Sequence, residues 1–194
     1  MKVCVVGAGS IGATIGAKLS AAGEQVCLLA RGAHLEALRS QGLQFVDRVG
    51  SRSGTYRLPA SAEPSDFGPQ DVVVIALKAY SVPAMLPRLA PLVDSGTVVL
   101  PALNGLPWWY FYRSGGPYEG MRLRSLDPGG TMDAALDCAR VIGCVAPYSA
   151  GRMKSFIAAS TTTKVLPRFC FVYSTRIKIT PAGPTNERPG SINR

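Results

Sequence analysis

Short apolar runs alternate with segments of helical periodicity along the first part of the chain. Lys2–Val6 is a β-branched run that stops at a glycine, which is typical of a buried parallel strand. Ser10–Ala22 is rich in Ala, Ile and Leu and precedes another glycine, the pattern of a helix and its C-terminal stop. A second apolar run, Gln25–Ala30, and a second helical segment, His34–Gln41, repeat the alternation. This alternation predicts a parallel sheet with helices on its faces.

The middle of the chain continues the same pattern. Asp71–Leu77 is an apolar run bounded by polar turns and predicts a buried strand. A helix punctuated by prolines is expected over Val82–Leu92, and another strand over Thr97–Leu103. Weaker strand patterns lie at Leu43–Val46, Tyr56–Leu58 and Val141–Val145. We therefore predict an α/β fold with a doubly wound, Rossmann-type parallel sheet over residues 1–145.

The composition and the hydrophobic pattern of the sequence change after residue 145. Residues 146–194 lack helical periodicity, and their last part is rich in Pro, Gly and Arg. They hold eight basic residues against one acid, so most of the formal charge of +9 lies there and the preceding part is nearly neutral. Phe169–Tyr173 and Arg176–Thr180 have the composition of strands, but no plan is evident. We predict a basic, irregular tail after a domain boundary near 145.

Cysteine usage and hydropathy narrow the class of protein. The five cysteines are Cys4, Cys27, Cys138, Cys144 and Cys170. They are odd in number and lack C-x-x-C spacing, which favours reduced thiols in a cytoplasmic protein over a disulfide or metal site. Glycines and a lysine interrupt the apolar N-terminus, so it does not resemble a signal peptide. No uncharged apolar stretch reaches the about 18 residues that a membrane span needs.

A glycine-rich motif lies between the first predicted strand and the first predicted helix. Its residues are Gly7, Ala8, Gly9, Ser10, Ile11 and Gly12, which fit G-x-G-x-x-G. Gly7 would allow a tight turn, Gly9 a close approach of the backbone to a pyrophosphate, and Gly12 close packing of helix on strand. The helix N-terminus adds free N–H groups and a partial positive charge. The motif predicts dinucleotide binding; the alternative is a doubly wound domain that holds no nucleotide.

Arg31 stands at the end of the second apolar run, where such a motif usually carries an acid. An acid there accepts hydrogen bonds from the ribose hydroxyls and repels a 2′-phosphate. An arginine instead offers the phosphate charge-assisted hydrogen bonds. The position therefore predicts NADP(H) over NAD(H), unless Arg31 is only a solvated surface residue.

Two polar residues follow predicted strands at their carboxyl ends, where ligands bind in open α/β sheets. Lys78 follows Asp71–Leu77, and Asn104 follows Thr97–Leu103. With the glycine loop they would border one cleft for cofactor and substrate; the alternatives are a surface lysine and an Asn-Gly turn. His34, the lone histidine, is expected on a helix surface, with a contact to adenosine at the rim as the alternative.

Taken together, these motifs resemble a known family. "GAGSIG" with Arg31, "ALKAYSV", "ALNGLPWWYF" and "GGPYEGMRLRSLDPGG" are similar to the ketopantoate reductases (2-dehydropantoate 2-reductases) over about residues 1–145. The resemblance implies NADPH-dependent reduction of a 2-keto acid, 2-dehydropantoate to pantoate, in pantothenate and coenzyme A biosynthesis. It also implies that Arg31 holds the 2′-phosphate and that Lys78 and Asn104 line the cofactor and substrate cleft. The chain has Ser81 where the family often has a glutamine.

The resemblance ends where the family continues into a helical domain. That domain carries the lysine that acts as general acid and a glutamate that orients substrate, and residues 146–194 do not match it. We therefore assign no catalytic residue and do not transfer the lysine's role to Lys154, Lys164 or Lys178. A shifted reading frame, a truncated relative and a purposeful basic tail are the three explanations left open.

Three functions follow from the sequence. The first is an NADP-dependent keto-acid reductase, of which this chain retains cofactor binding. The second is a non-catalytic NADP(H)-binding or sensing module. The third is nucleic-acid binding through the basic tail, whose aromatic residues could stack on bases, although the tail contains no recognised module. Apolar surface left by the missing domain would favour aggregation or pairing, and hence a homodimer.

Overall fold

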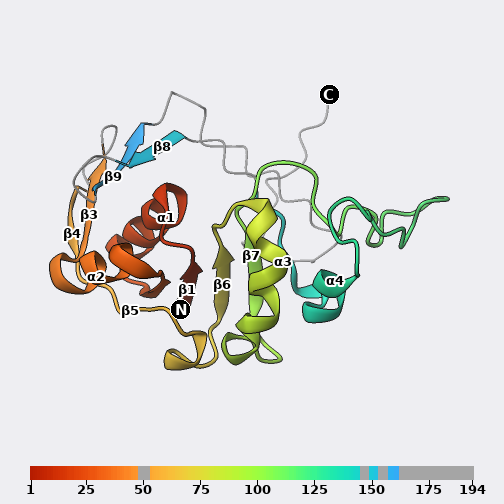
Figure 1. Cartoon of the computed structure of the whole chain (residues 1–194), viewed down its shortest axis with the longest axis horizontal. Coiled ribbons are helices and arrows are strands. Elements are labelled where there is room, and N and C mark those ends of the chain that lie inside the picture. Colours follow the sequence, from red (N-terminus) through yellow and green to blue (C-terminus); the bar gives the residue numbers. More distant parts are fainter. Residues whose placement is uncertain (48–52, 145–148, 153–156, 162–194) are drawn as a thin grey trace, which may run out of the picture.

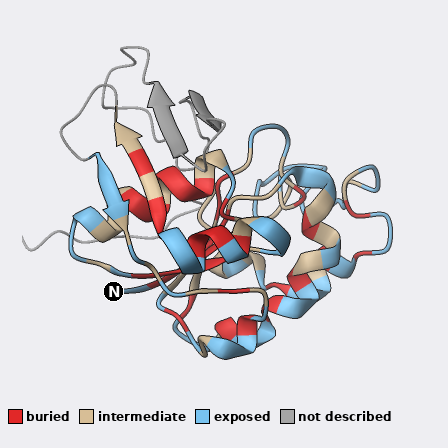
Figure 2. Cartoon of the chain, turned by 60° about the vertical axis from the view of Figure 1, so that its left-hand side comes forward, coloured by how far each residue is buried: buried red, intermediate tan, exposed pale blue. Residues whose placement is uncertain are grey.

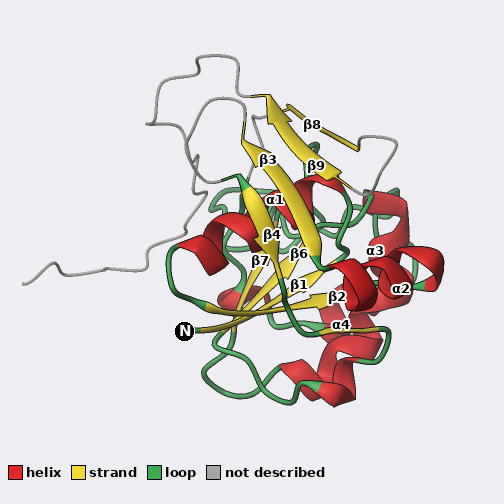
Figure 3. Cartoon of the chain, turned by 90° about the vertical axis from the view of Figure 1, so that its left-hand side faces the viewer, coloured by secondary structure: helices red, strands yellow, loops and turns green. Residues whose placement is uncertain are grey.

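The computed structural model describes residues 1–47, 53–144, 149–152 and 157–161. Two sheets are present in this part of the chain, and the helices gather around the larger one (Figures 1 and 3). The larger sheet has the order β5-β2-β1-β6-β7 and is parallel throughout. Its strands are β1 (Lys2–Val6), β2 (Gln25–Leu29), β5 (Ala60–Ser61), β6 (Val72–Ile75) and β7 (Val98–Pro101). The predicted doubly wound α/β fold is confirmed.

Both faces of the central sheet are covered, as a parallel sheet requires. Along β1, Cys4 and Val6 belong to one buried cluster, while Val3 and Val5 belong to another. Helices α1 (Ser10–Ala21) and α2 (Gly32–Gln41) contribute residues to the second cluster. Burial is concentrated in the sheet and on the sides of the helices that pack on it (Figure 2). Because successive residues of a strand face alternate sides of the sheet and both sides are buried, β1 and β2 are apolar at every position after the first.

The segment expected to be one helix is divided in two. Residues Val82–Met85 form α3, and Leu86–Leu92 continue as the 3-10 helix η3. Pro87 and Pro91 lack the N–H that an α-helical ladder needs, which accounts for the change. The segment still buries three leucines against the sheet, so its apolar side is the one that the sequence predicts. The prediction of one continuous helix was wrong.

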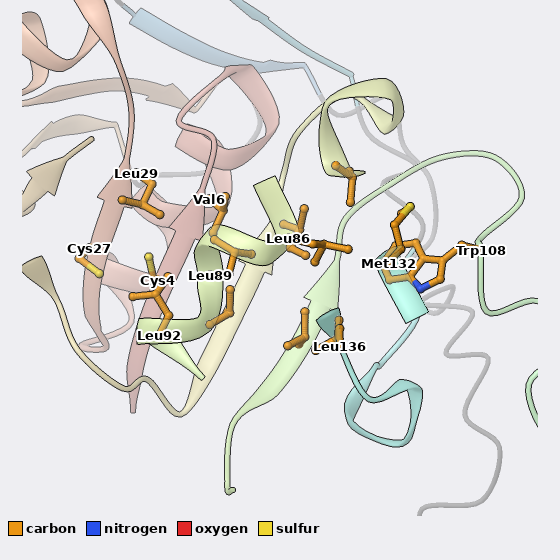
Figure 4. Packing of buried hydrophobic residues seen from close by; sticks show 14 residues of the cluster. Cys4, Val6, Cys27, Leu29, Leu86, Leu89, Leu92, Trp108, Met132 and Leu136 are labelled. Carbon is orange, nitrogen blue, oxygen red and sulfur yellow. The ribbon is translucent and has the colours of Figure 1, made fainter. Parts of the chain in front are cut away.

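A long connection after β7 extends one core cluster. It contains α4 (Thr131–Ala135) and η4 (Cys138–Arg140). Trp108, Met132 and Leu136 continue the cluster that Leu86 and Leu89 form on the sheet (Figure 4). Beyond it, Val141 makes an isolated parallel bridge to Val99 of β7, and Cys144 makes one to Ala102, directly after β7. Over the described residues, the strand expected at 141–145 is therefore present only as these two bridges.

The smaller sheet has the order β4-β3-β9-β8. Its strands are β3 (Leu43–Asp47), β4 (Gly54–Tyr56), β8 (Ser149–Arg152) and β9 (Ile157–Thr161). β9 runs parallel to β3 and antiparallel to β8, and both contact α1 (Figure 3). The expectation of an irregular segment after 145 is therefore wrong for these two strands. The other strand-like stretches of the tail, 169–173 and 176–180, lie outside the described residues, and the boundary at 145 stays a prediction.

The remaining short elements are η1 (Pro64–Asp66) and η2 (Ala79–Ser81). η1 follows β5 and packs against η3, whereas η2 follows β6 and leads into α3. Both therefore lie after strands of the central sheet, on the side where its strands end. Their position determines which side chains surround that edge of the sheet.

The packing of α1 on β1 depends on Gly12. A Cβ at this position would collide with the carbonyl oxygen of Gly7 and stand 3.0 Å from Ala76 Cβ and from Val5 Cγ1. We expect Gly12→Ala to lower the free energy of unfolding by about 1–3 kcal/mol, the usual cost of overpacking. Urea denaturation checks this.

Gly54→Ala is the matched control for this substitution. Gly54 has no positive φ, and the nearest atom to its added Cβ is 3.9 Å away. If the two variants unfold at the same urea concentration, the close approach of α1 to β1 at position 12 does not determine the stability of the fold.

Candidate functional site

A cavity of about 730 Å³ opens where β1, β2, β5 and β6 end. Residues within two positions after the end of each of these strands line it, which is where ligands bind in open α/β sheets. The strand order reverses between β1 and β6, so the cavity stands at the topological switch point of the fold. Its volume lies within the range of small-molecule sites, about 300–1,000 Å³.

The glycine loop forms one wall of this cavity. The N–H groups of Gly7 and Ala8 donate to the Leu29 carbonyl oxygen at 3.0 and 3.2 Å, so the loop is tied to the end of β2. Gly7 has φ +97°, and a Cβ there would stand 2.6 Å from Leu77 Cδ2. A side chain at position 7 would therefore strain the backbone and clash with the loop after β6.

Gly9 borders the open part of the cavity. It is the N-cap residue of α1, and a Cβ added to it would have no atom within 4 Å. The first turn of α1 carries no acidic residue. The N–H groups at this end of the helix have no carbonyl partner within the helix, and the helix dipole is positive here. An anion could therefore approach the backbone closely at this point.

The side chain of His34 contacts the glycine loop. It lies on α2, is half-buried and lines the cavity, rather than lying on an exposed helix face. Its Nε2 is 2.6 Å from the carbonyl oxygen of Ala8, and since a carbonyl only accepts, Nε2 carries the proton in this contact. The side chain connects α2 to the loop that precedes α1. Its role in this structure is to position the loop.

Arg31 enters the same cavity from the end of β2. It is the N-cap residue of α2, with extended backbone, and is exposed. Of the sequence-predicted site residues, the cavity is lined by Gly7, Ala8, Gly9, Ser10 and Arg31. The glycine loop and Arg31, which were predicted separately from the sequence, thus share one cavity.

Four other predicted site residues do not line this cavity. Gly12 is a buried residue of α1 and Ile11 is half-buried, as expected for the part of the motif that packs the helix on β1. Lys78 precedes η2 and Asn104 follows β7, and both are exposed at the same edge of the sheet. Their contact with cofactor or substrate stays a prediction. Ser81, which replaces the glutamine common in the family, does line the cavity.

Among the lining residues that were not predicted from the sequence, three have charged or aromatic side chains. Glu63 follows β5, Arg88 lies in η3, and Tyr80 stands at the rim with 84% of its surface exposed. Arg88 Nη2 is 3.1 Å from Glu63 Oε2, so these two form an ion pair within the cavity wall. β5 has only two residues, which is too short for a hydrophobic pattern to reveal.

Cys4, Cys27 and Cys138 are free thiols. Cys4 and Cys27 are register partners on β1 and β2 and are buried, and Cys27 Sγ donates to Gln70 Oε1 at 3.9 Å. Burial and the carboxylate of Asp133 raise the pKa of the Cys138 thiol to about 12. A thiol with such a pKa is a poor nucleophile near neutral pH. Cys170 lies outside the described residues.

Two negative findings apply to the described ranges only. Over residues 1–47, 53–144, 149–152 and 157–161, no cluster of three or more His, Cys, Asp or Glu could hold a metal ion. In the same ranges no helix has the length and hydropathy to cross a membrane.

Comparison with known proteins assigns the family. The model of the ketopantoate reductase family PanE/ApbA matches residues 3–107. A 2-dehydropantoate 2-reductase from Mesorhizobium japonicum is 44% identical over 146 residues, covering 75% of this chain and 44% of the relative. The chain belongs to the ketopantoate reductase family, and the predicted resemblance is confirmed. This membership also supports the prediction of an NADP(H) cofactor.

Solved structures agree with this assignment. A candidate ketopantoate reductase from Ralstonia solanacearum MolK2 superposes with a TM-score of 0.76 at 37% identity, covering 82% of this chain and 49% of that one. D-mandelate dehydrogenase, solved with NADH and anilino(oxo)acetate, shares the fold at 20% identity, with a TM-score of 0.62. The chain spans less than half the length of these relatives.

The contact between His34 and Ala8 yields a test of the loop. We expect His34→Ala to lower the free energy of unfolding by about 1 kcal/mol, the usual net value of one hydrogen bond. Thermal or urea unfolding measures it. Glu36→Ala, at an exposed position of the same helix, is the control. Equal stability of the two variants would show that the contact does not hold the loop.

Proposed function

We propose that this chain binds NADP(H) and serves as the cofactor-binding half of a 2-keto-acid reductase. The observation that carries the proposal is the open space at Gly9, beside the uncapped N-terminus of α1 and in one cavity with Arg31. Family membership supports the same cofactor. The geometry of the cavity and the family membership thus support the proposal independently.

The residues present fit a dinucleotide phosphate. The pyrophosphate would lie at the N-terminus of α1, where Gly9 leaves room and N–H groups are available. Arg31 would bind the 2′-phosphate, because its guanidinium can donate two parallel hydrogen bonds to phosphate oxygens. His34 and Ala8 would keep the loop in place between these two anchor points. Binding would thus use the loop after β1 and the N-terminal ends of α1 and α2.

The substrate class follows from the family. When bound, NADPH supplies a hydride to the C2 carbonyl of a 2-keto acid, here 2-dehydropantoate, in pantothenate biosynthesis. Lys78 and Asn104, at the same edge of the sheet, would border the substrate. Reduction also needs a proton donor at the developing alkoxide, and we assign none in this chain. Where the family often has a glutamine, Ser81 offers a shorter hydroxyl.

A non-catalytic NADP(H)-binding or sensing module is the second candidate. It uses the same cavity and the same residues, Gly9 and Arg31. Oxidation of NADPH on adding 2-dehydropantoate distinguishes the two functions. We place either one in the cytoplasm, and we leave pairing of two copies as a proposal that sedimentation can check.

Substitution of Arg31 tests the cofactor. We expect Arg31→Ala to weaken NADPH binding about 10- to 100-fold, because charged hydrogen bonds contribute about 1.5–3 kcal/mol, and to leave NADH binding nearly unchanged. Fluorescence titration with each nucleotide measures both affinities. Equal losses for NADPH and NADH would contradict recognition of the 2′-phosphate by Arg31.

Substitution of Gly9 tests the phosphate loop. Because space is open there, Gly9→Ala should change the free energy of unfolding by no more than about 1 kcal/mol, a helix N-cap effect. The added methyl would nevertheless obstruct the pyrophosphate and weaken both NADPH and NADH. Unchanged affinity in the folded variant would mean that the pyrophosphate does not approach Gly9.

A further inference from the structure

An ion pair stands in the wall of the cofactor cavity. Arg88 Nη2 lies 3.3 Å from Glu63 Oε1 and 3.1 Å from Glu63 Oε2, and about half of each side chain is exposed. The hydrogen bonds between them use only the Nη2 end of the guanidinium. Arg88 has further N–H groups on Nη1 and Nε that could meet another acceptor.

Both partners are held by the elements around them. Glu63 precedes η1, and its backbone N–H donates to the hydroxyl of buried Ser61 at 3.1 Å. Arg88 lies in η3 between Leu86 and Leu89, which are buried in the core. Since η1 packs against η3, the pair is located by the fold rather than by its own attraction.

The pair changes the charge that a nucleotide would meet. Among the residues that the structure describes, three side chains with a formal charge line the cavity: Arg31, Glu63 and Arg88. A carboxylate close to the end of β2 is the group that favours ribose hydroxyls and repels a 2′-phosphate. The sequence lacks such an acid directly after β2, but the fold brings Glu63 from the neighbouring strand into the same cavity. Arg88 neutralises it there.

We propose that the Glu63–Arg88 ion pair sets the preference of the cavity between NADPH and NADH. With Arg88 in place, Glu63 is neutralised and Arg31 attracts the 2′-phosphate without opposition. Without Arg88, the carboxylate opposes Arg31 and the preference moves toward NADH. The inference rests on the proposed NADP(H) binding and adds a second charged element to its specificity.

Fluorescence titrations with NADPH and with NADH test this proposal at low ionic strength, where charge effects are least screened. The principal comparison is among the unsubstituted chain, Arg88→Met, Glu63→Gln and the double variant. Arg88→Lys keeps the charge and should restore most of the preference. Arg124→Met, at an exposed position outside the cavity lining, is the matched control. Circular dichroism confirms that each chain is folded.

The readout is the ratio of NADPH affinity to NADH affinity. For unit charges in a partly solvated site, we expect Arg88→Met to lower this ratio roughly threefold to tenfold and Glu63→Gln to raise it. The double variant should return close to the unsubstituted ratio, because both charges are gone together. Arg124→Met should leave the ratio unchanged.

The titrations test the role of the ion pair and the proposed NADP(H) binding separately. If the unsubstituted chain binds NADPH but Arg88→Met and Glu63→Gln leave the ratio within about twofold, the ion pair does not set the preference and the proposed function stands. If the folded, unsubstituted chain binds neither nucleotide, the proposed function fails and this inference fails with it.

Discussion

Helix α1 can lie directly against β1 only because position 12 has no side chain. That contact places the N-terminus of α1 beside the loop that follows β1, where a Cβ at position 12 would meet the carbonyl of Gly7. The positive end of the helix dipole therefore points at the cavity instead of at protein atoms. The proposed pyrophosphate site depends on this approach, because its donors would be backbone N–H groups at the start of α1. Arg31 would bind the 2′-phosphate separately, through its side chain.

The sequence predicted the parts of this arrangement that depend on local pattern. The apolar runs of the central strands, the glycine spacing and the arginine after the second run are each contained within a few residues. Gly7 and Gly12 occupy the tight turn and the close packing that were expected of them. Such features can be predicted from the sequence because the backbone geometry of a tight turn or a close contact restricts which residues can occupy it.

Features that depend on contacts between distant segments were not predictable. Glu63 reaches the cavity through a strand of two residues, and Arg88 through a 3-10 helix that prolines separate from α3. β9 lies beside β3, far away in sequence, so no pattern within the tail announced it. In each case the position of the segment depends on the distant segment that it packs against rather than on its own composition. A charged pair brought together in this way can alter the preference for NADP(H) that Arg31 alone suggests.

Chemical shift mapping of the ¹⁵N-labelled chain with NADP⁺ tests the central claim most directly. The account predicts saturable shifts of the backbone amides from Gly9 to Gly12 and at Arg31, with the α1 amides nearest the loop most affected. With 2′-phosphate removed, as in NAD⁺, the loop amides should still respond and Arg31 should respond less. Saturable binding of NADP⁺ that leaves the amides of Gly9–Gly12 unshifted would contradict the account, because the helix N-terminus would then not be the phosphate site.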